Sequence, residues 1–280
     1  MITVETAGVL TTIQDRGRFG LAHLGVPRAG PLDRPAAGLA NRLVGNPVDA
    51  ALLEVTWGGL AVRTDLGCWV AVTGAAVPVT VDGAPRGRDR AEWLPSGRVL
   101  RLGAPATGVR CYLAVAGGID VEPVLGSRAT DTLAWVGPPR VEPGAALPVG
   151  VPVHPPAPLE TPRPPPRGPV RVLPGPRADW FAEDALEQLC ATSYAATEDS
   201  NRVGLRLEGE APRRVRDDEL PSEGMVLGAI QVPPGGQPIV LLADHPPTGG
   251  YPVLAVVHPD DLWQCGQLRP GEAVRFVRAS

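Results

Sequence analysis

The chain has no lysine, and all 26 of its basic residues are arginine. A lysine amine is needed for Schiff-base catalysis, for the common phosphate-binding loop and for covalent attachment of biotin. The first two chemistries are therefore excluded for this chain. It also cannot carry biotin itself, so any biotin involved in its reaction must be attached to another chain.

Cysteine and histidine are scarce and scattered. The four cysteines stand at positions 68, 111, 190 and 265, with no Cys-x-x-Cys, and the four histidines form no His-Glu-x-x-His. Isolated cysteines of this kind are typical of buried free thiols in a reducing compartment. Zinc sites need clustered ligands. We therefore expect no disulfide and no metal held by the protein.

Several longer patterns are missing as well. No apolar run reaches the roughly 18 residues that a membrane-spanning helix needs, and the N-terminus does not resemble a signal peptide. We therefore expect a cytoplasmic protein without a membrane partner. The net charge of −4 has no basic cluster, which argues against nucleic acid. Gly-x-Ser-x-Gly and both common glycine-rich nucleotide loops are absent, so the sequence offers no serine-hydrolase elbow and no nucleotide site.

What is present predicts a mainly β chain with a few short helices, of the α+β class. Short apolar or alternating runs recur about every ten residues, separated by turn pairs such as Asp82-Gly83. Residues 151–169 contain nine prolines and no apolar periodicity, which indicates a linker. We predict a β-rich domain over 1–150, with a short helical segment near 34–53, and a second β domain over 170–280.

The helices are predicted from apolar spacing. Asp33 precedes a helical pattern and, with Pro35 in the first turn, is expected to be its N-cap. A second short helix is expected over Ala50 to Leu53. The clearest helical pattern runs from Asp179 to Cys190, with an apolar and an acidic face.

Local chemistry singles out the end of one predicted strand. Ile239 to Ala243 is an apolar run bounded by turn residues, and Asp244 follows it directly. A loop with Thr248 and two glycines comes next, so that backbone N–H groups can approach a ligand. The segment is therefore either an anion or carbonyl site or simply a turn capped by Asp244.

Two arginine-containing segments also leave two interpretations open. Asp15, Arg16 and Arg18 lie in a glycine-flanked turn, where they either clamp an anion or form a structural ion pair. Arg202 and Arg206 are four residues apart in a predicted strand and are expected on the same face. That face is either a solvated edge or an anion site.

A set of short motifs occurs in one order along nearly the whole chain. They are Thr11 to Arg18, Gly25-Val26-Pro27 with Asp33, Ala40 to Asn46, Leu53-Glu54, Gly117 to Asp120, Leu125 to Arg128, Gly175-Pro176, Asn201 to Leu207, Ser222 to Gly224, Gly228 to Pro233, Asp244 with Thr248 to Pro252, and Gln267 to Gly271. This combination resembles the family of the C-type 5-oxoprolinase subunit, also known as the second subunit of allophanate hydrolase. That family includes the kinase A inhibitor antagonist and the carboxyltransferase domain of urea carboxylase.

The chain departs from the family pattern at three places. Pro246-Pro247 replaces a polar pair before Thr248. Asn201-Arg202-Val203-Gly204 stands where the family often has Asp-Arg-Met-Gly, and Ala129 stands where a serine is common. All three changes bear on the substrate contacts that the family pattern implies.

The resemblance implies a cyclophilin-like β-barrel in the C-terminal half, packed on the β-rich N-terminal half. It implies a B-type subunit related to kinase A inhibitor and an A-type subunit, which together with this chain open 5-oxoproline to glutamate using ATP. One alternative is a carboxyltransferase subunit acting on urea or another amide, with biotin on a separate carrier. Another is a non-catalytic regulatory partner of the B-type subunit.

The resemblance also implies a set of site residues for a small-molecule substrate. The expected catalytic residues are Asp244, Thr248 and Tyr251. The expected substrate-binding residues are Asn201, Arg202, Arg206, Gln231, Gly249, Gly250, Asn41, Glu54, Asp15 and Arg18. No metal is expected, and no cofactor is expected on this chain.

Overall fold

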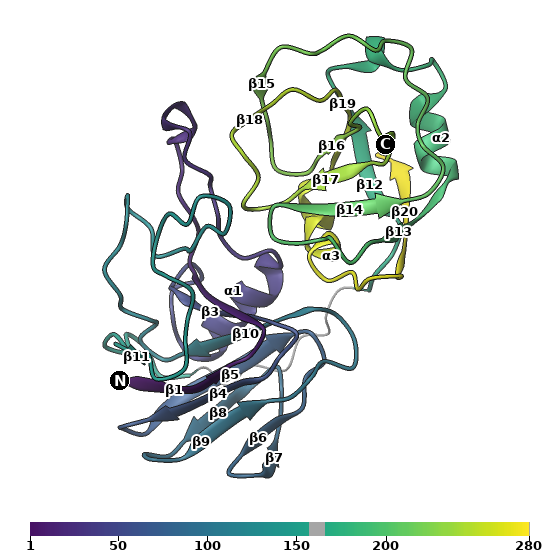
Figure 1. Cartoon of the computed structure of the whole chain (residues 1–280). Helices are drawn as coiled ribbons and strands as arrows, with labels where there is room; N and C mark the ends of the chain where they lie inside the picture. Colours follow the sequence, from purple (N-terminus) through teal and green to yellow (C-terminus); the bar gives the residue numbers. More distant parts are fainter. Residues whose placement is uncertain (157–165, 280) are drawn as a thin grey trace. The chain divides into compact units, whose positions relative to one another are not determined.

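The computed structural model describes residues 1–156 and 166–279, so the middle of the predicted linker lies outside the described residues. The chain divides into two compact units (Figure 1). The first contains Met1–Arg18, Ala29–Asp131 and the described part of 135–165. The second contains the chain from Pro166 onward. Two short stretches of the N-terminal half, Phe19–Arg28 and Thr132–Ala134, belong to the second unit, which the sequence did not predict.

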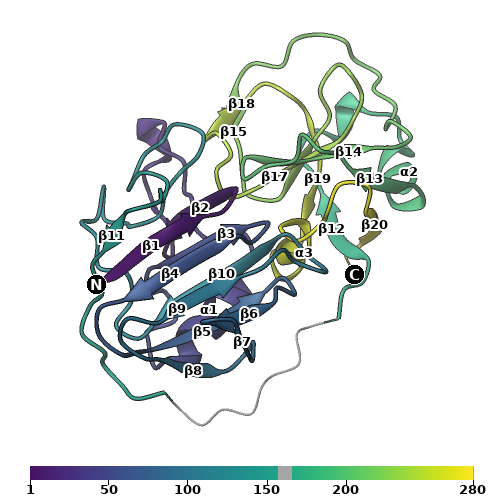
Figure 2. The same cartoon turned by 60° about the horizontal axis from the view of Figure 1, so that its bottom comes forward.

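The first unit is built from two antiparallel sheets (Figure 2). The six-stranded sheet has the order β11 (Ala146–Leu147), β1 (Ile2–Ala7), β4 (Leu60–Thr64), β9 (Val99–Leu102), β6 (Val79–Val81), β7 (Ala84–Arg86). The five-stranded sheet has the order β2 (Leu10–Gln14), β3 (Leu52–Thr56), β10 (Arg110–Val115), β5 (Cys68–Gly74), β8 (Ala91–Leu94). One apolar cluster takes side chains from both sheets, such as Val62 and Leu113, and burial of each such side chain stabilises the unit by about 1.5–3 kcal/mol.

Helix α1 (Arg34–Leu43) covers the other face of the five-stranded sheet. Ala40 and Leu43 pack against Ala71 and Tyr112 in a second apolar cluster. The Asp33 carboxylate accepts a hydrogen bond from the Ala36 N–H at 3.0 Å, and a proline stands in the first turn. The predicted N-cap is therefore confirmed.

The second short helix expected over Ala50 to Leu53 is wrong. Leu52 begins strand β3, where it pairs with Gln14, and Leu53 pairs with Ile13 and Leu113. A short apolar run does not distinguish a helix from a buried strand, and here the neighbouring strands on both sides decide for the strand.

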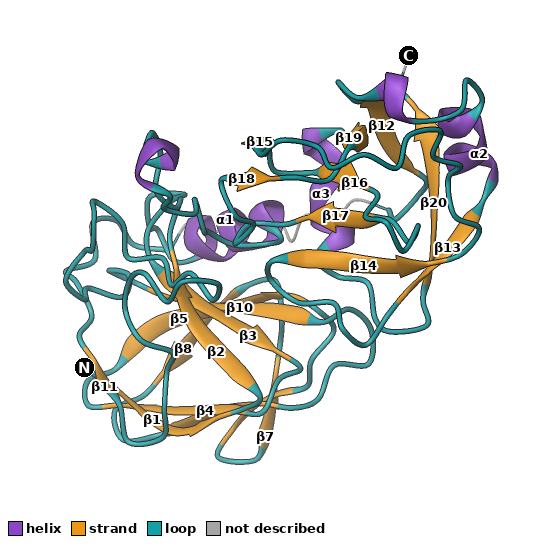
Figure 3. Ribbon diagram, turned by 45° about the horizontal axis from the view of Figure 1, so that its top comes forward, coloured by secondary structure: helices purple, strands orange, loops and turns teal. Residues whose placement is uncertain are grey.

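The second unit contains a closed barrel with the order β12 (Val170–Pro174), β19 (Val253–Val257), β16 (Ala229–Gln231), β17 (Ile239–Leu241), β14 (Gly204–Glu208), β13 (Ser193–Ala196), β20 (Ala273–Arg278). A separate two-stranded sheet pairs β15 (Glu223–Gly224) with β18 (Thr248–Gly249). Figure 3 shows strands and loops throughout, with only short helices, so the predicted mainly β class is confirmed.

The predicted helix over Asp179 to Cys190 is interrupted. A 3₁₀ turn spans Ala178–Trp180, and α2 spans Ala185–Ala191. Between them Phe181 has extended backbone and forms an isolated bridge with Arg214. Trp180 and Phe181 are both buried, so their burial does not require one continuous helix. The third helix, α3, spans Leu262–Cys265. No helix among the described residues is long and apolar enough to cross a membrane.

Candidate functional site

Asp244 lies just beyond β17 and is completely buried. Its carboxylate receives both ends of the Arg202 guanidinium, with Nε donating to Oδ2 at 2.8 Å and Nη2 donating to Oδ1 at 2.9 Å. The backbone N–H and hydroxyl of Thr132 also donate to Oδ2, at 2.9 and 2.7 Å. All three residues belong to the second unit. The carboxylate therefore fixes the Thr132 segment to the barrel.

This environment limits what Asp244 can do chemically. Both oxygens already accept hydrogen bonds, and the negative charge is neutralised by a guanidinium that is only 1% exposed. Paired, desolvated charges of this kind hold a structure in one arrangement. In this arrangement Asp244 and Arg202 have the geometry of a positioning pair. The catalytic assignment of Asp244 stays a prediction.

The expectation that Arg202 and Arg206 share a face is wrong. Arg202 is buried against Asp244, whereas Arg206 is exposed. The alternation rule does not extend to Arg202, because β14 begins only at Gly204. Before that strand, the Asn201 carboxamide oxygen accepts hydrogen bonds from the N–H groups of residues 203 and 204, at 2.8 and 3.2 Å. Asn201 therefore shapes the turn that buries Arg202.

The loop after Asp244 contributes strand β18 to the two-stranded sheet that it forms with β15. Strand β18 pairs Thr248 with Gly224 and Gly249 with Glu223, and the Glu223 carboxylate receives the Arg177 Nε at 2.9 Å. Thr248 and Tyr251 are exposed, so both side chains can meet a ligand.

The two glycines of this loop have packing roles. A Cβ on Gly249 would lie 3.2 Å from the Met225 Cγ, and one on Gly250 would lie 3.1 Å from the Leu220 carbonyl oxygen. A side chain at either position would therefore make a tight contact, and its neighbour would have to shift by a few tenths of an ångström. Gln231 is half-buried in β16 and pairs with Ile239 and Val253, so it lies within the barrel wall.

His245, which sequence reasoning did not select, is buried directly beside this pair. Its Nδ1 lies 2.8 Å from the Pro246 carbonyl oxygen, which can only accept a hydrogen bond. Nδ1 therefore carries the proton in the neutral ring, and Nε2 is the nitrogen that can accept a hydrogen bond. Burial lowers the pKa of the imidazole and outweighs the hydrogen bond to the Pro246 carbonyl and the Asp244 charge, which raise it, while the Arg28 charge lowers it further. These effects together favour the neutral form.

Glu54 and Asn41 are both buried in the first unit. Glu54 Oε2 accepts hydrogen bonds from the Leu32 N–H and the Tyr112 hydroxyl, each at 2.9 Å, which anchors the chain before α1. The Asn41 Nδ2 donates to the carbonyls of Val48 and Ala50 at 3.2 and 2.8 Å. Both side chains therefore stabilise the connection between α1 and the neighbouring strands.

Asp15 and Arg18 bind one loop of the first unit. Asp15 Oδ1 accepts from the Ser127 hydroxyl at 2.5 Å, and Oδ2 accepts from the Arg128 N–H at 2.6 Å. Arg18 is 3% exposed, and its Nε donates to the Val124 carbonyl at 3.1 Å. These contacts favour the structural interpretation of the turn over an anion clamp.

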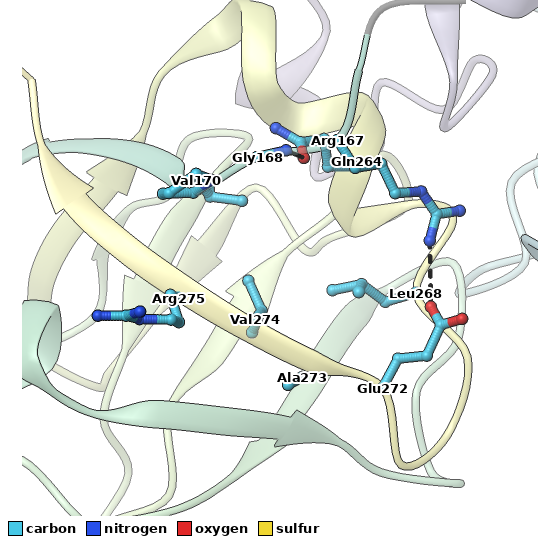
Figure 4. A pocket seen from close by; sticks show the side chains of 10 residues that line it. Arg167, Gly168, Val170, Gln264, Leu268, Glu272, Ala273, Val274 and Arg275 are labelled. Atoms are coloured by element: carbon cyan, nitrogen blue, oxygen red, sulfur yellow. Dashed lines mark hydrogen bonds and ion pairs between the residues drawn. The ribbon is translucent and has the colours of Figure 1, made fainter.

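A cavity of about 380 Å³ opens elsewhere in the second unit, at the start of β12 and β20 (Figure 4). Val170, Val274 and Leu268 form its apolar lining, and an ion pair between Arg167 and Glu272 stands at one side with 3.1 Å between Nη1 and Oε2. None of the predicted site residues lines it. No group of three or more potential metal ligands occurs among the described residues.

The structure thus joins only part of the predicted set. Asp244 and Arg202 are in direct contact, and β18, with Gly250 and Tyr251 directly after it, follows shortly after Asp244 in the chain. Sequence reasoning missed Thr132, which is 112 positions from Asp244. No local pattern marks such a contact, because only the fold brings these segments together.

Comparisons with known proteins assign the chain to a family. The carboxyltransferase domain, subdomain A and B, matches residues 24–278. The chain is 37% identical to the C-type 5-oxoprolinase subunit of Escherichia coli, over 100% of this chain and 92% of that protein. It is 32% identical to urea amidolyase of Saccharomyces cerevisiae, over 100% of this chain but 17% of that protein.

Solved structures agree with the sequence relatives. The crystal structure of TTHA0988 superposes with a TM-score of 0.89 at 39% identity, over 99% of this chain and 55% of that one. The Kluyveromyces lactis urea amidolyase superposes with a TM-score of 0.90 at 30% identity, over 100% of this chain and 19% of that one. Family match, whole-chain identity and fold agree, and the chain belongs to the family of the carboxyltransferase domain, subdomain A and B.

Proposed function

We propose that this chain is the C-type subunit of an ATP-dependent 5-oxoprolinase complex, which opens 5-oxo-L-proline to L-glutamate together with A-type and B-type subunits. The supporting observation is the 37% identity to the E. coli C-type 5-oxoprolinase subunit over nearly the whole length of both chains. The 5-oxoprolinase subunit of the same type from Haemophilus influenzae is 30% identical over 92% of its length. The chain covers 92% of each of these two relatives, so its length is that of a separate subunit of this type.

The chemistry of the reaction explains why this chain would act within a complex. A lactam is stabilised by resonance, so its hydrolysis benefits from activation of the carbonyl oxygen by ATP. This chain has no lysine and no nucleotide loop, so we assign nucleotide binding to the other subunits. The exposed Thr248 and Tyr251 hydroxyls are the groups of this chain that contact the substrate in our proposal. Oriented donors of this kind stabilise charge that develops on a carbonyl oxygen.

The Asp244–Arg202 pair has a positioning role in this proposal. It holds the segment that leads into β18 on one side and Thr132 on the other, without contacting the reacting atoms. Preorganised hydroxyl groups act efficiently because they need no rearrangement at the moment of reaction. The buried pair supplies that rigidity to the segment that leads into Thr248.

The test is a reconstitution of the complex. The chain is co-expressed with the A-type and B-type subunits of the same organism, and ATP hydrolysis and glutamate formation are measured with 5-oxoproline or urea, with and without avidin. ATP turnover stimulated by 5-oxoproline and indifferent to avidin supports the proposal. No stimulation by 5-oxoproline in an assembled complex overturns it.

A second candidate function is carboxyl transfer from biotin to urea or another amide. It is favoured by the 32% identity to a yeast urea amidolyase and by the TM-score of 0.90 to the K. lactis urea amidolyase. Because the chain has no lysine, the biotin carrier would be a separate chain. Turnover that needs such a carrier and is blocked by avidin would establish this function in place of the first.

A further inference from the structure

The cavity at the start of β12 and β20 exists because the two strands stop pairing there. Val170 pairs with Phe276 in parallel register, and continuing that register would bring Pro169 into the ladder. Proline has no N–H to donate, so the pairing ends at this residue. The Gly168 N–H donates instead to the Gln264 Oε1 at 2.9 Å. Among the described strands, none lies beside the first residues of β20 on this edge, and the cavity of about 380 Å³ opens between the two diverging segments.

The cavity has the size and the walls of a site for a small molecule. Its volume lies at the lower end of the range of ligand pockets, which is about 300–1,000 Å³. The side chains of Val170 and Val274 are 1% and 5% exposed, and the half-buried Leu268 also lines the cavity (Figure 4). No aromatic side chain occurs among the described lining residues. These aliphatic walls suit a small ring of methylene groups.

The ion pair at one side of the cavity offers hydrogen-bond donors and an acceptor next to each other. Arg167 Nη1 lies 3.1 Å from Glu272 Oε2, and Arg167 Nη2 donates to the Gln267 carbonyl at 3.1 Å. A guanidinium has more donors than these two contacts use. Glu272 Oε2 also accepts from the Arg269 N–H at 3.1 Å, whereas Oε1 makes no hydrogen bond within the described part of the chain. The pair can therefore both donate to a ligand and accept from it.

This pair suits a neutral amide better than a charged amine. The amide C=O can accept from Arg167 while the amide N–H donates to Glu272. In a lactam the N–H and the C=O point to the same side of the ring, so both can meet the pair at once. An ammonium group in the same place would lie close to the Arg167 guanidinium, and like charges repel. The charge of Glu272 is already compensated by its partner.

Arg275 provides a positive charge for a second group of the ligand. It lines the cavity, is exposed, and has no ion-pair partner among the described residues. Figure 4 shows it on the opposite side of Val274 from the ion pair. The charged lining residues are two arginines and one glutamate, so their sum is one positive charge. This balance favours an anion, and a carboxylate is the anion that a guanidinium binds in two-point geometry.

We propose that this cavity binds a small lactam that carries a carboxylate. The amide lies on Arg167 and Glu272, the ring lies against the aliphatic wall, and the carboxylate lies on Arg275. This inference rests on the proposed function, because 5-oxo-L-proline is a lactam of this kind. The site is additional to the exposed hydroxyls near β18, which do not line the cavity. It holds the substrate on this subunit.

The experiment is an NMR titration of the purified full-length chain with 5-oxo-L-proline, 2-pyrrolidinone and L-proline. L-proline has a similar ring and the carboxylate but a charged amine, so its Kd should be at least about tenfold higher than that of 5-oxo-L-proline. The amide resonances of Gly168 and Ala273 should shift on binding, because both residues line the cavity. Arg275→Gln should raise the Kd for 5-oxo-L-proline about tenfold, since a charge-assisted contact is lost. The Kd for 2-pyrrolidinone, which has no carboxylate, should stay within about twofold.

Arg278→Gln is the matched control. Arg278 is exposed on the same strand and does not line the cavity, so the variant removes the same charge and should leave each Kd unchanged. Because both arginines are exposed, both variants should unfold at the wild-type temperature.

Several results would overturn the site. They are an unchanged affinity in Arg275→Gln, an equal loss in Arg278→Gln, equal affinities for L-proline and 5-oxo-L-proline, and shifts confined to resonances near Thr248. Absence of 5-oxo-L-proline binding would overturn the site even if the reconstituted complex turns this substrate over. Binding in the cavity without turnover by the assembled complex would overturn the proposed function and leave the site standing.

Discussion

The buried pair of Asp244 and Arg202 allows a sharp prediction about stability. In Asp244→Asn the side chain keeps its shape and can still accept a hydrogen bond from Thr132. The substitution, however, removes the negative charge that both ends of the Arg202 guanidinium contact, and Arg202 is only 1% exposed. Removing one partner of a fully buried ion pair costs about 3–5 kcal/mol. This is a large share of the roughly 5–15 kcal/mol by which a domain is stable.

A double variant separates the cost of removing one charge of the pair from the cost of losing the hydrogen bonds between the two side chains. Arg202→Met together with Asp244→Asn removes both charges of this pair. The double variant should therefore be no less stable than the more damaging single variant, and the two effects should be clearly non-additive. Urea unfolding followed by circular dichroism gives the free energies. The expected loss in Asp244→Asn corresponds to a melting temperature lower by about 6 to 20 °C.

A matched control lies in the same unit. Arg171 and Asp261 form an ion pair with the same two-point geometry, at 2.8 Å for both contacts, but the Arg171 side chain is 44% exposed. Solvent screens such a pair, so Asp261→Asn should be clearly less destabilising than Asp244→Asn. Equal losses in the two variants, or a loss below about 1 kcal/mol in Asp244→Asn, would refute the argument from breaking a buried ion pair.

Four further predictions follow from individual side chains. The lowered pKa of His245 means that the native state resists its protonation, so stability should fall as the pH drops below the unfolded value near 6.5, and His245→Gln should flatten this dependence in urea titrations at pH 5 to 8. Burial raises the pKa of Cys111 and Cys265 to about 12, so neither thiol should react with Ellman's reagent at pH 8 until urea unfolds the chain, and fast labelling of either in the native protein would contradict this. Asn41→Ala should cost about 1–3 kcal/mol of stability through the unsatisfied carbonyls of Val48 and Ala50, while the KM of the reconstituted complex stays at the wild-type value. Tyr251→Phe removes one exposed hydroxyl and should lower kcat at least about tenfold with assembly intact, and unchanged turnover would remove Tyr251 from the site.

Part of the fold could be predicted from sequence because its signals are local. Asp33 caps α1 because a short acceptor side chain before an apolar helical pattern can reach the N–H of Ala36. The alternating runs predicted strands because residue parity decides which face is buried. These rules failed where contacts with segments distant in the sequence decided the local structure. Leu52 entered a strand because β2 and β10 lie on either side of β3, and Phe181 left the helical pattern to form a bridge with Arg214.

The candidate site divides in the same way. The order of motifs along the chain was sufficient to recognise the family and to select Asp244 and Arg202, but not to assign their roles. Only the tertiary structure showed that both are desolvated and bound to each other, and that Thr132, 112 residues from Asp244, completes the group. It also showed that Asp15 and Arg18 hold a turn in place. Burial and pairing depend on segments that the sequence keeps far apart. The amino acids alone therefore determine which charges the chain has, and the fold determines which of them remain available to a ligand or a partner.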